Sequence, residues 1–103
     1  MGSITVAQIQ NVYSGLCLNI SGASSANGAA AIQWGCDPGA TNEQFWVRPT
    51  PQGMPYSTIY DPRIGTCLDD PGDSSAQGTK LQFYQCNLTA AQVWYEYGWI
   101  GVV

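Results

Sequence analysis

Short apolar runs alternate with clusters of Gly, Pro, Ser and Asn along the whole chain. No stretch holds a helical period for three turns, so the pattern favours strands and argues against helices longer than a single turn. Clusters such as Asp37-Pro38-Gly39 and Pro71-Gly72-Asp73 supply turns between the runs. The strands expected from this pattern cover residues 7–13, 16–20, 30–35, 44–48, 57–60, 66–69, 80–85 and 92–97.

The segment from Gly15 to Cys36 returns fifty residues later as the segment from Gly65 to Cys86, with nine of its 22 aligned positions identical. A second match sets Gln44-Phe45-Trp46 against Gln92-Val93-Trp94, after a two-residue deletion. A fixed period of this length indicates one supersecondary unit used twice. The 103 residues therefore predict a single small all-β domain, residues 1–103, with a core formed by Leu18, Ile20, Trp46, Leu68, Phe83 and Trp94.

The four cysteines fall two to a repeat at the same spacing. Three pairings are possible, and a unit used twice most simply closes on itself, which predicts the disulfides Cys17–Cys36 and Cys67–Cys86. A zinc site is the alternative, but the spacing lacks the close Cys-x-x-Cys pairs of structural zinc sites. Two disulfides in a small domain indicate an oxidising compartment, so we expect a secreted, extracellular protein.

Charge is scarce: 10% of residues are charged, the net charge is −4, and only three residues are Lys or Arg. This balance lacks the basic surface that nucleic acid or an anionic membrane requires. No apolar run is long enough to insert into a membrane. We therefore expect no nucleic-acid partner and no membrane insertion.

Catalytic residues are also scarce, because the chain has no histidine and we expect every cysteine to be paired. A nucleophile activated by an imidazole base is therefore absent. Asp69 with Asp70 or Asp73 could flank a sugar as in a glycosidase, but this stretch is first a Pro-Gly turn with solvated flanks. We expect no enzyme, no cofactor and no metal site, since the spacing of a calcium loop is missing as well.

The order Gly-x-Cys-Leu-Asp, Ser-Ser-x-x-Gly, Gln-x-Tyr/Trp-x-Cys and Gln-x-Trp resembles ricin B-type lectins and family 13 carbohydrate-binding modules. The resemblance extends over about nine-tenths of the chain, from Ala7 to Tyr97. The second repeat matches better, at Gly65, Cys67, Leu68, Asp69, Gly78, Gln82, Tyr84, Cys86, Gln92 and Trp94. The first repeat keeps Gly15, Cys17, Leu18, Gly28, Trp34, Cys36, Gln44 and Trp46.

The resemblance implies a β-trefoil, which is built from three such repeats. This chain offers two, at about 7–49 and 56–97, and residues 98–103 look like the opening strand of a third. Oligomerisation, a partner chain or the terminal segments would then complete the barrel. We rank assembly with like or unlike chains above self-closure.

The same resemblance implies a carbohydrate site in the second repeat. Asp69 takes the place of the carboxylate that accepts from sugar hydroxyls, Tyr84 the aromatic platform and Gln82 a supporting amide. The asparagine of the family is replaced by Ala91, and Asn87 is close enough in sequence to compensate.

The first repeat departs further, with Asn19 in place of the carboxylate, Ile32 in place of the glutamine and Glu43 at the asparagine position. Trp34 keeps the platform, so Asn19 and Trp34 would form a second, weaker site. The leading hypothesis is a non-catalytic lectin module for galactose-like or xylose-like sugars. The alternative is a structural or partner-binding subunit whose sugar sites have degenerated.

Overall fold

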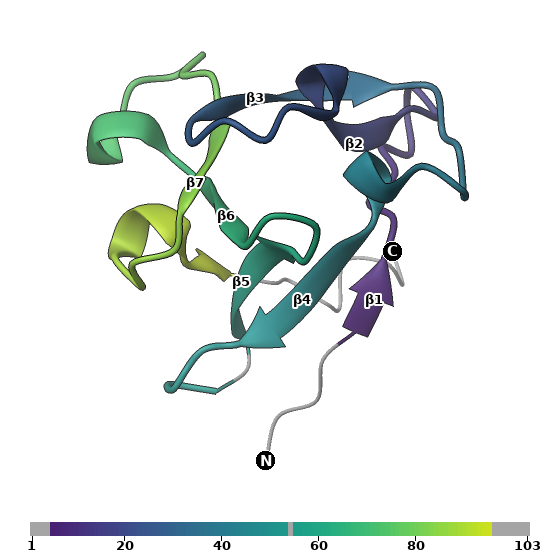
Figure 1. Ribbon diagram of the computed structural model, residues 1–103. Helices are drawn as coiled ribbons and strands as arrows, with labels where there is room; N and C mark the ends of the chain where they lie inside the picture. The colour runs from purple at the N-terminus through teal and green to yellow at the C-terminus, as the bar shows by residue number, and fades with distance from the viewer. Residues whose placement is uncertain (1–4, 54, 96–103) are drawn as a thin grey trace.

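A computed structural model describes residues 5–53 and 55–95 of the chain (Figure 1). The described part is all-β, with single 3₁₀ turns in the loops. The strands are β1 (Thr5–Ala7), β2 (Cys17–Ile20), β3 (Ala29–Trp34), β4 (Phe45–Pro49), β5 (Tyr56–Asp61), β6 (Thr66–Asp69), β7 (Gln82–Gln85) and β8 (Trp94–Tyr95). The 3₁₀ turns are η1 (Ser21–Ala23), η2 (Thr41–Glu43), η3 (Pro71–Asp73) and η4 (Ala90–Gln92).

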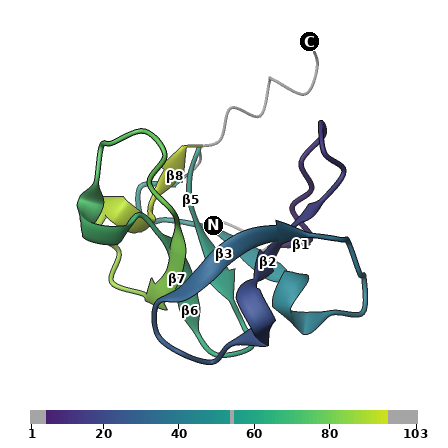
Figure 2. The ribbon, with the colours of Figure 1, turned by 90° about the horizontal axis from the view of Figure 1, so that it is seen from above.

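The strands form two lobes with the same internal plan. Lobe one holds β1 to β4 and lobe two holds β5 to β8. Antiparallel pairing runs β1–β4–β5–β8, while β2–β3 and β6–β7 form one hairpin in each lobe. Figure 2 shows β3 and β7 beside each other, where Ala29 pairs with Phe83 and Ala30 with Gln82 across the two lobes.

The core lies where the two lobes meet. Phe45 and Phe83 are fully buried, and their rings stack with centroids 5.2 Å apart. Ile20, Leu68 and Ala29 complete the buried cluster, and Leu18 and Trp94 pack against it from partly buried positions. The core positions expected at Ile20, Leu68 and Phe83 are confirmed. Leu18, Trp46 and Trp94 were also expected there but are only partly buried, and the ring of Trp46 lies against that of Tyr60 instead. One lobe alone would leave half of this apolar cluster in water.

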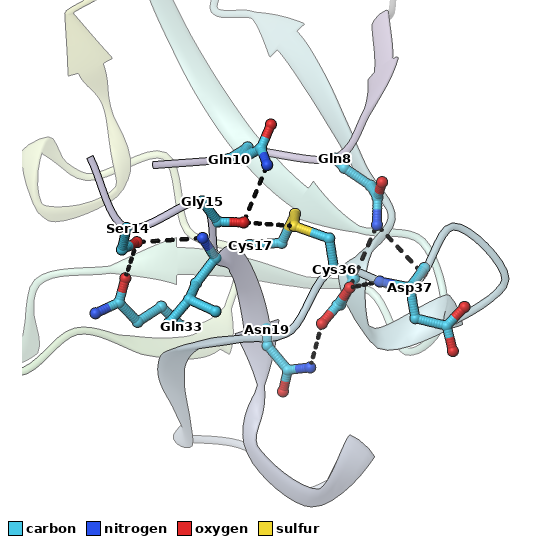
Figure 3. Close-up of a disulfide and its surroundings, with 11 residues drawn as sticks. Gln8, Gln10, Ser14, Gly15, Cys17, Asn19, Gln33, Cys36 and Asp37 are labelled. Carbon is cyan, nitrogen blue, oxygen red and sulfur yellow. Dashed lines mark hydrogen bonds between the residues drawn. A yellow bond between two sulfur atoms is a disulfide. The ribbon is translucent and has the colours of Figure 1, made fainter. Parts of the chain in front are cut away.

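Both predicted disulfides are present, Cys17–Cys36 and Cys67–Cys86, each with Cα atoms 5.1 Å apart. Each bond ties the start of a hairpin to the loop that follows it. The disulfide region of lobe one is drawn in Figure 3, where Gln10 points to the carbonyl oxygen of Gly15. None of the described cysteines is left free.

The first predicted strand, residues 7–13, is wrong, because β1 covers Thr5–Ala7 and residues 11–15 form a turn. Asn11 causes the turn. Its Oδ1 accepts from the backbone nitrogens of Tyr13 and Ser14, both at 2.9 Å, and its carbonyl accepts from Gly15 N at 2.8 Å. An Asn side chain that bonds the backbone ahead of it competes with strand pairing.

Two later strands are shorter than predicted. The expected strand at 80–85 begins only at Gln82, where β7 meets a partner. The expected strand at 92–97 is reduced in the described part to β8, because Ala90–Gln92 forms η4, and residues 96 and 97 lie outside the described residues. The same is true of residues 98–103, so the opening strand expected there stays a prediction.

Candidate carbohydrate site

The four site residues predicted in lobe two line one open cavity of about 470 Å³. Asp69 ends β6, and Gln82 and Tyr84 lie on the neighbouring strand β7. Asn87 follows the disulfide residue Cys86. The cavity is lined by Asp69, Asp70, Gly72, Asp73, Gln82, Tyr84, Asn87, Thr89 and Ala91.

Asp69 is the buried anchor of this cavity, with 5% of its surface exposed. Its Oδ2 accepts from Gln82 Nε2 at 2.8 Å, and its Oδ1 accepts from Gln92 Nε2 at 3.1 Å. Bonds of this kind to an ionised carboxylate are about twice as strong as neutral ones, and they offset the cost of burying the charge. Asp69 therefore has a structural role besides any contact with a ligand.

Gln92 holds the floor of the site in place and is itself fully buried. Besides Asp69, its Nε2 donates to the carbonyl of Gln85 at 2.9 Å, and its Oε1 accepts from Asn87 N at 2.9 Å. This agrees with the requirement that a buried amide find partners for both its donor and its acceptor. The glutamine of Gln-x-Trp thus connects the site to the loop that carries Asn87.

Tyr84 and Asn87 lie at the rim of the cavity. Tyr84 is 39% exposed and lines the cavity, so part of its side chain is within reach of a ligand. Asn87 Oδ1 accepts from Thr89 N at 3.0 Å and from Thr89 Oγ1 at 2.7 Å. Asn87 is thereby a turn residue whose side-chain NH₂ is the group that it can offer to a ligand.

Asp70, Asp73 and Thr89 also line the cavity. From the sequence, Asp70 and Asp73 were considered only as partners of Asp69 in a glycosidase pair, and Thr89 was not considered. The signal was the Asp-Asp-Pro-Gly-Asp stretch, which folds into η3 beside Asp69. Asp70 Oδ1 is buried without a hydrogen-bond partner among the described residues. Three carboxylates thus surround the cavity, and the described part of the chain holds no His, Cys, Asp and Glu cluster suited to a metal ion.

The alignment of the two Gln-x-Trp motifs requires correction by one residue. Glu43 ends η2 as Gln92 ends η4, and Phe45 begins β4 as Trp94 begins β8. Glu43 Oε1 accepts from Asp37 N at 2.8 Å, which repeats the bond from Asn87 N to Gln92 Oε1. Only one residue is deleted between the cysteine loop and this point, rather than two.

The pair in lobe one that corresponds to Asp69 and Gln92 is Asn19 and Glu43. Its buried carboxylate is on Glu43, the counterpart of Gln92. Glu43 is 1% exposed and its Oε2 accepts from Asn19 Nδ2 at 2.8 Å, where lobe two has an amide donating to Asp69. Figure 3 shows Asn19 below the disulfide and Gln8 to the right of it, and Gln8 Nε2 also donates to Glu43 Oε1, at 3.3 Å. A carboxylate and an amide have exchanged places within one hydrogen-bonded pair.

The prediction that Glu43 stands at the asparagine position of the family is therefore wrong, because Asn42 stands there. Asn42 Nδ2 donates to Asn19 Oδ1 at 3.3 Å and to the carbonyl of Ile20 at 3.1 Å. Trp34 is 64% exposed on β3. Lobe one thus has an exposed tryptophan and two neutral amides, while its buried carboxylate belongs to Glu43.

The helices in the described part of the chain are single 3₁₀ turns, and none is long and apolar enough to cross a membrane.

Known structures share this arrangement. A designed three-fold symmetric protein, ThreeFoil, matches with a TM-score of 0.80 and 24% identity, over 90% of this chain and 66% of its own. The exo-β-1,3-galactanase 1,3Gal43A from Clostridium thermocellum matches with a TM-score of 0.80 and 28% identity, over 91% of this chain and 20% of its own. The PSL1a–E64 complex matches with a TM-score of 0.77 and 18% identity, over 91% of this chain and 33% of its own.

The chain thus spans about two thirds of ThreeFoil and about a third or less of the other two structures. Two lobes aligned with two thirds of a three-fold symmetric protein identify the fold as β-trefoil, with two of its three lobes present here. No curated protein matches the sequence. A family model, the ricin-type β-trefoil lectin domain-like model, matches residues 2–84. Two lobes of trefoil topology, the paired cysteine loops and this match show that the chain belongs to the ricin-type β-trefoil lectin domain-like family.

Proposed function

We propose that lobe two is a non-catalytic carbohydrate-binding site. The observation that carries this proposal is the cavity in which a half-exposed tyrosine, two amides and three carboxylates meet. A pyranose has an apolar face of C–H groups and a rim of hydroxyls, and these need an aromatic ring and hydrogen-bond acceptors respectively. The ricin B-type family is generally non-catalytic, which fits binding rather than hydrolysis.

In this proposal the sugar ring stacks on Tyr84 while its hydroxyls reach Asp69 and Gln82. Both oxygens of Asp69 already accept one amide hydrogen each, and a carboxylate oxygen has room for a second donor. Asn87 contributes its NH₂ group from the rim. Each residue has in this proposal the role that the resemblance implies for it.

The charge of the cavity limits the class of sugar. Asp69, Asp70 and Asp73 line it together. Carboxylates accept from hydroxyls and repel other anions, so neutral sugars are favoured over uronic or sialic acids. A galactose-like or xylose-like ring fits this requirement, and the name of the similar exo-β-1,3-galactanase supports the galactose-like choice.

Affinity per site is expected in the millimolar range, about −4 kcal/mol. The cavity is open, and Ala91 stands where the family has an asparagine. Useful binding would then depend on several sites acting together. Asn19 and Trp34 in lobe one form the second, weaker site of this proposal, since Asn19 is neutral and its amide is engaged by Glu43.

A secreted, extracellular protein is part of the same proposal, because two disulfides persist best in an oxidising compartment. Glycan-bearing surfaces are also found there.

Calorimetric titration with galactose and with xylose tests the proposal. Tyr84→Ala should abolish binding, whereas Tyr13→Ala, the same change on a fully exposed turn, should leave it unchanged. Trp34→Ala should remove only a minor fraction of the binding. Loss of binding in Trp34→Ala but not in Tyr84→Ala would contradict the assignment of the working site to lobe two.

The alternative function, a structural or partner-binding subunit, is favoured by a different observation. Val12 and Tyr13 are 99% and 100% exposed at the tip of one turn. Two adjacent apolar side chains fully in water are unusual in a small domain and mark a surface for another protein.

A further inference from the structure

Lobe two docks on lobe one through a definite set of contacts. Its turn between β5 and β6 carries Arg63, whose Nη1 donates to the carbonyl of Ala23 at 2.9 Å and whose Nη2 donates to that of Ser24 at 2.7 Å. Beside this turn, Gly28 N donates to the carbonyl of Phe83 at 2.8 Å, which extends the pairing of β3 with β7. One lobe thus offers a turn, and its neighbour offers a 3₁₀ turn and the start of a strand.

Lobe one carries the same turn without a neighbour among the described residues. Gly15 N donates to the carbonyl of Asn11 at 2.8 Å, as Gly65 N donates to that of Asp61 at 2.8 Å. At the position of Arg63 stands Tyr13, which is fully exposed. The turn that attaches lobe two to lobe one therefore has an equivalent in lobe one, and the tip of that equivalent turn is exposed to solvent.

Lobe two carries the complementary 3₁₀ turn. Ala23 in η1 and Asp73 in η3 share a left-handed backbone, with φ of 50° and 52°. Arg63 takes the carbonyls of Ala23 and Ser24, whose counterparts in lobe two are Asp73 and Ser74. The second acceptor turn thus exists and has the conformation of the occupied one.

The strand beside this turn is incomplete. β3 begins at Ala29, and the equivalent position in lobe two is Thr79, but β7 begins only at Gln82. The residues at which β3 pairs across the lobes, Ala29 and Ala30, correspond to Thr79 and Lys80. β7 therefore lacks the residues that correspond to the start of β3, where β3 pairs with lobe two.

We propose that these elements form one docking face for a single further lobe of the same repeat type on a second polypeptide segment. The docking face consists of Val12, Tyr13, Asp73, Ser74, Thr79 and Lys80. Its gap is one lobe wide, because the two lobes superpose on a three-fold symmetric protein over 66% of that protein. The incoming lobe covers Tyr13 with its 3₁₀ turn and places its own β-turn on Asp73.

Charge specifies the chemistry of that incoming turn. Asp73 is exposed and adds a carboxylate to the main-chain oxygens of its turn. An arginine at the tip of the incoming turn, as at Arg63 in this chain, can donate both to the main-chain oxygens and to the carboxylate of Asp73. Lobe two itself meets this description, so a copy of it is a suitable probe.

The test uses the whole chain with a second copy of residues 50–103 joined after Val103, which supplies the probe lobe at high effective concentration. We expect one cooperative unfolding transition, with a melting temperature at least about 10 °C above that of the parent chain. Tyr13→Asp should lower the melting temperature of the extended chain by about 5 °C and that of the parent by less than about 2 °C, because Tyr13 is exposed in the parent. Leu88→Asp, the same kind of change at an exposed residue outside the docking face, should affect both chains equally.

An extended chain that melts like the parent, or one indifferent to Tyr13→Asp, would overturn the proposal. Sedimentation of the parent tests the choice of occupant. A monomer is expected, and a dimer that Tyr13→Asp dissociates would show that a second copy fills the face instead. The readouts are independent of sugar, so a chain that fails to bind sugar leaves this inference intact.

Discussion

The exchange of carboxylate and amide between the lobes makes a sharp prediction about Asn19. Its Nδ2 lies 2.8 Å from Glu43 Oε2, and the two side chains are 6% and 1% exposed. Asn19→Asp would set two carboxylates at hydrogen-bonding distance in a buried place, where both cannot remain ionised without a large cost. We expect the free energy of unfolding to fall by about 3–5 kcal/mol, the usual cost of an uncompensated buried charge.

A second substitution should rescue the first. Asn19→Asp with Glu43→Gln recreates in lobe one the pair that lobe two uses, in which Gln92 donates to Asp69. The glutamine Oε1 can still accept from Asp37 N, as Gln92 Oε1 accepts from Asn87 N. We expect the double variant to lie within about 1 kcal/mol of the parent, because both partners of Oε1, Asp37 N and Gln8 Nε2, keep their bonds and only the charge on those two bonds is lost.

Denaturant unfolding of the parent, both single variants and the double variant measures the coupling between the two positions. The account requires a coupling free energy of at least about 2 kcal/mol. Gln52→Glu is the matched control, since it adds the same charge at an exposed residue and should change stability by less than about 0.5 kcal/mol. A coupling below about 0.5 kcal/mol would refute the exchange and with it the corrected alignment.

Three further variants test the fold. Replacing Cys67 and Cys86 by alanine should lower the free energy of unfolding by about 3 kcal/mol, because the loop of the unfolded chain is no longer closed. An unchanged denaturation midpoint would contradict this. Arg63→Ala should lower the free energy of unfolding by about 2–4 kcal/mol, because it removes two charge-assisted hydrogen bonds between the lobes. Arg63→Lys should recover part of this loss. Equal melting temperatures of the two variants would argue against the contact. Gly28→Ala should lower the free energy of unfolding by about 1–2 kcal/mol, because the backbone there has φ of +93°, which disfavours residues with a Cβ. An unchanged melting temperature in calorimetry would contradict the positive φ at this position.

The duplicated sequence allowed the disulfides and most strands to be predicted, because each recurs with the same spacing. The long first strand failed for a local reason: Asn11 captures the backbone nitrogens of Tyr13 and Ser14, and apolar periodicity alone does not register that competition. The boundary of β7 was missed because apolar periodicity does not show where pairing partners begin: the strand starts at Gln82, which pairs with Asp69 of β6 and Ala30 of β3.

The site was predicted in part. Asp69, Gln82, Tyr84 and Asn87 do meet in one cavity, and each was named from the repeat and its resemblance. The role of Glu43 was not foreseen, because the neighbouring Gln44 offered a better letter match to Gln92 than the residue that takes its place. Glu and Gln differ only in one carboxylate oxygen against an NH₂ group. Glu43 can therefore take the place of Gln92 because its partner is Asn19 where the partner of Gln92 is Asp69.

The central claim, a neutral sugar bound in lobe two, is tested most directly by titrating ¹⁵N-labelled protein with galactose and following its amide resonances. The account predicts saturable, millimolar shifts at Asp69, Gln82, Tyr84 and Asn87, and smaller shifts around Trp34. Glucuronic acid should cause none in the acidic cavity. Shifts confined to lobe one, or a spectrum unchanged by galactose and xylose at about 0.1 M, one hundred times the expected Kd, would contradict the account.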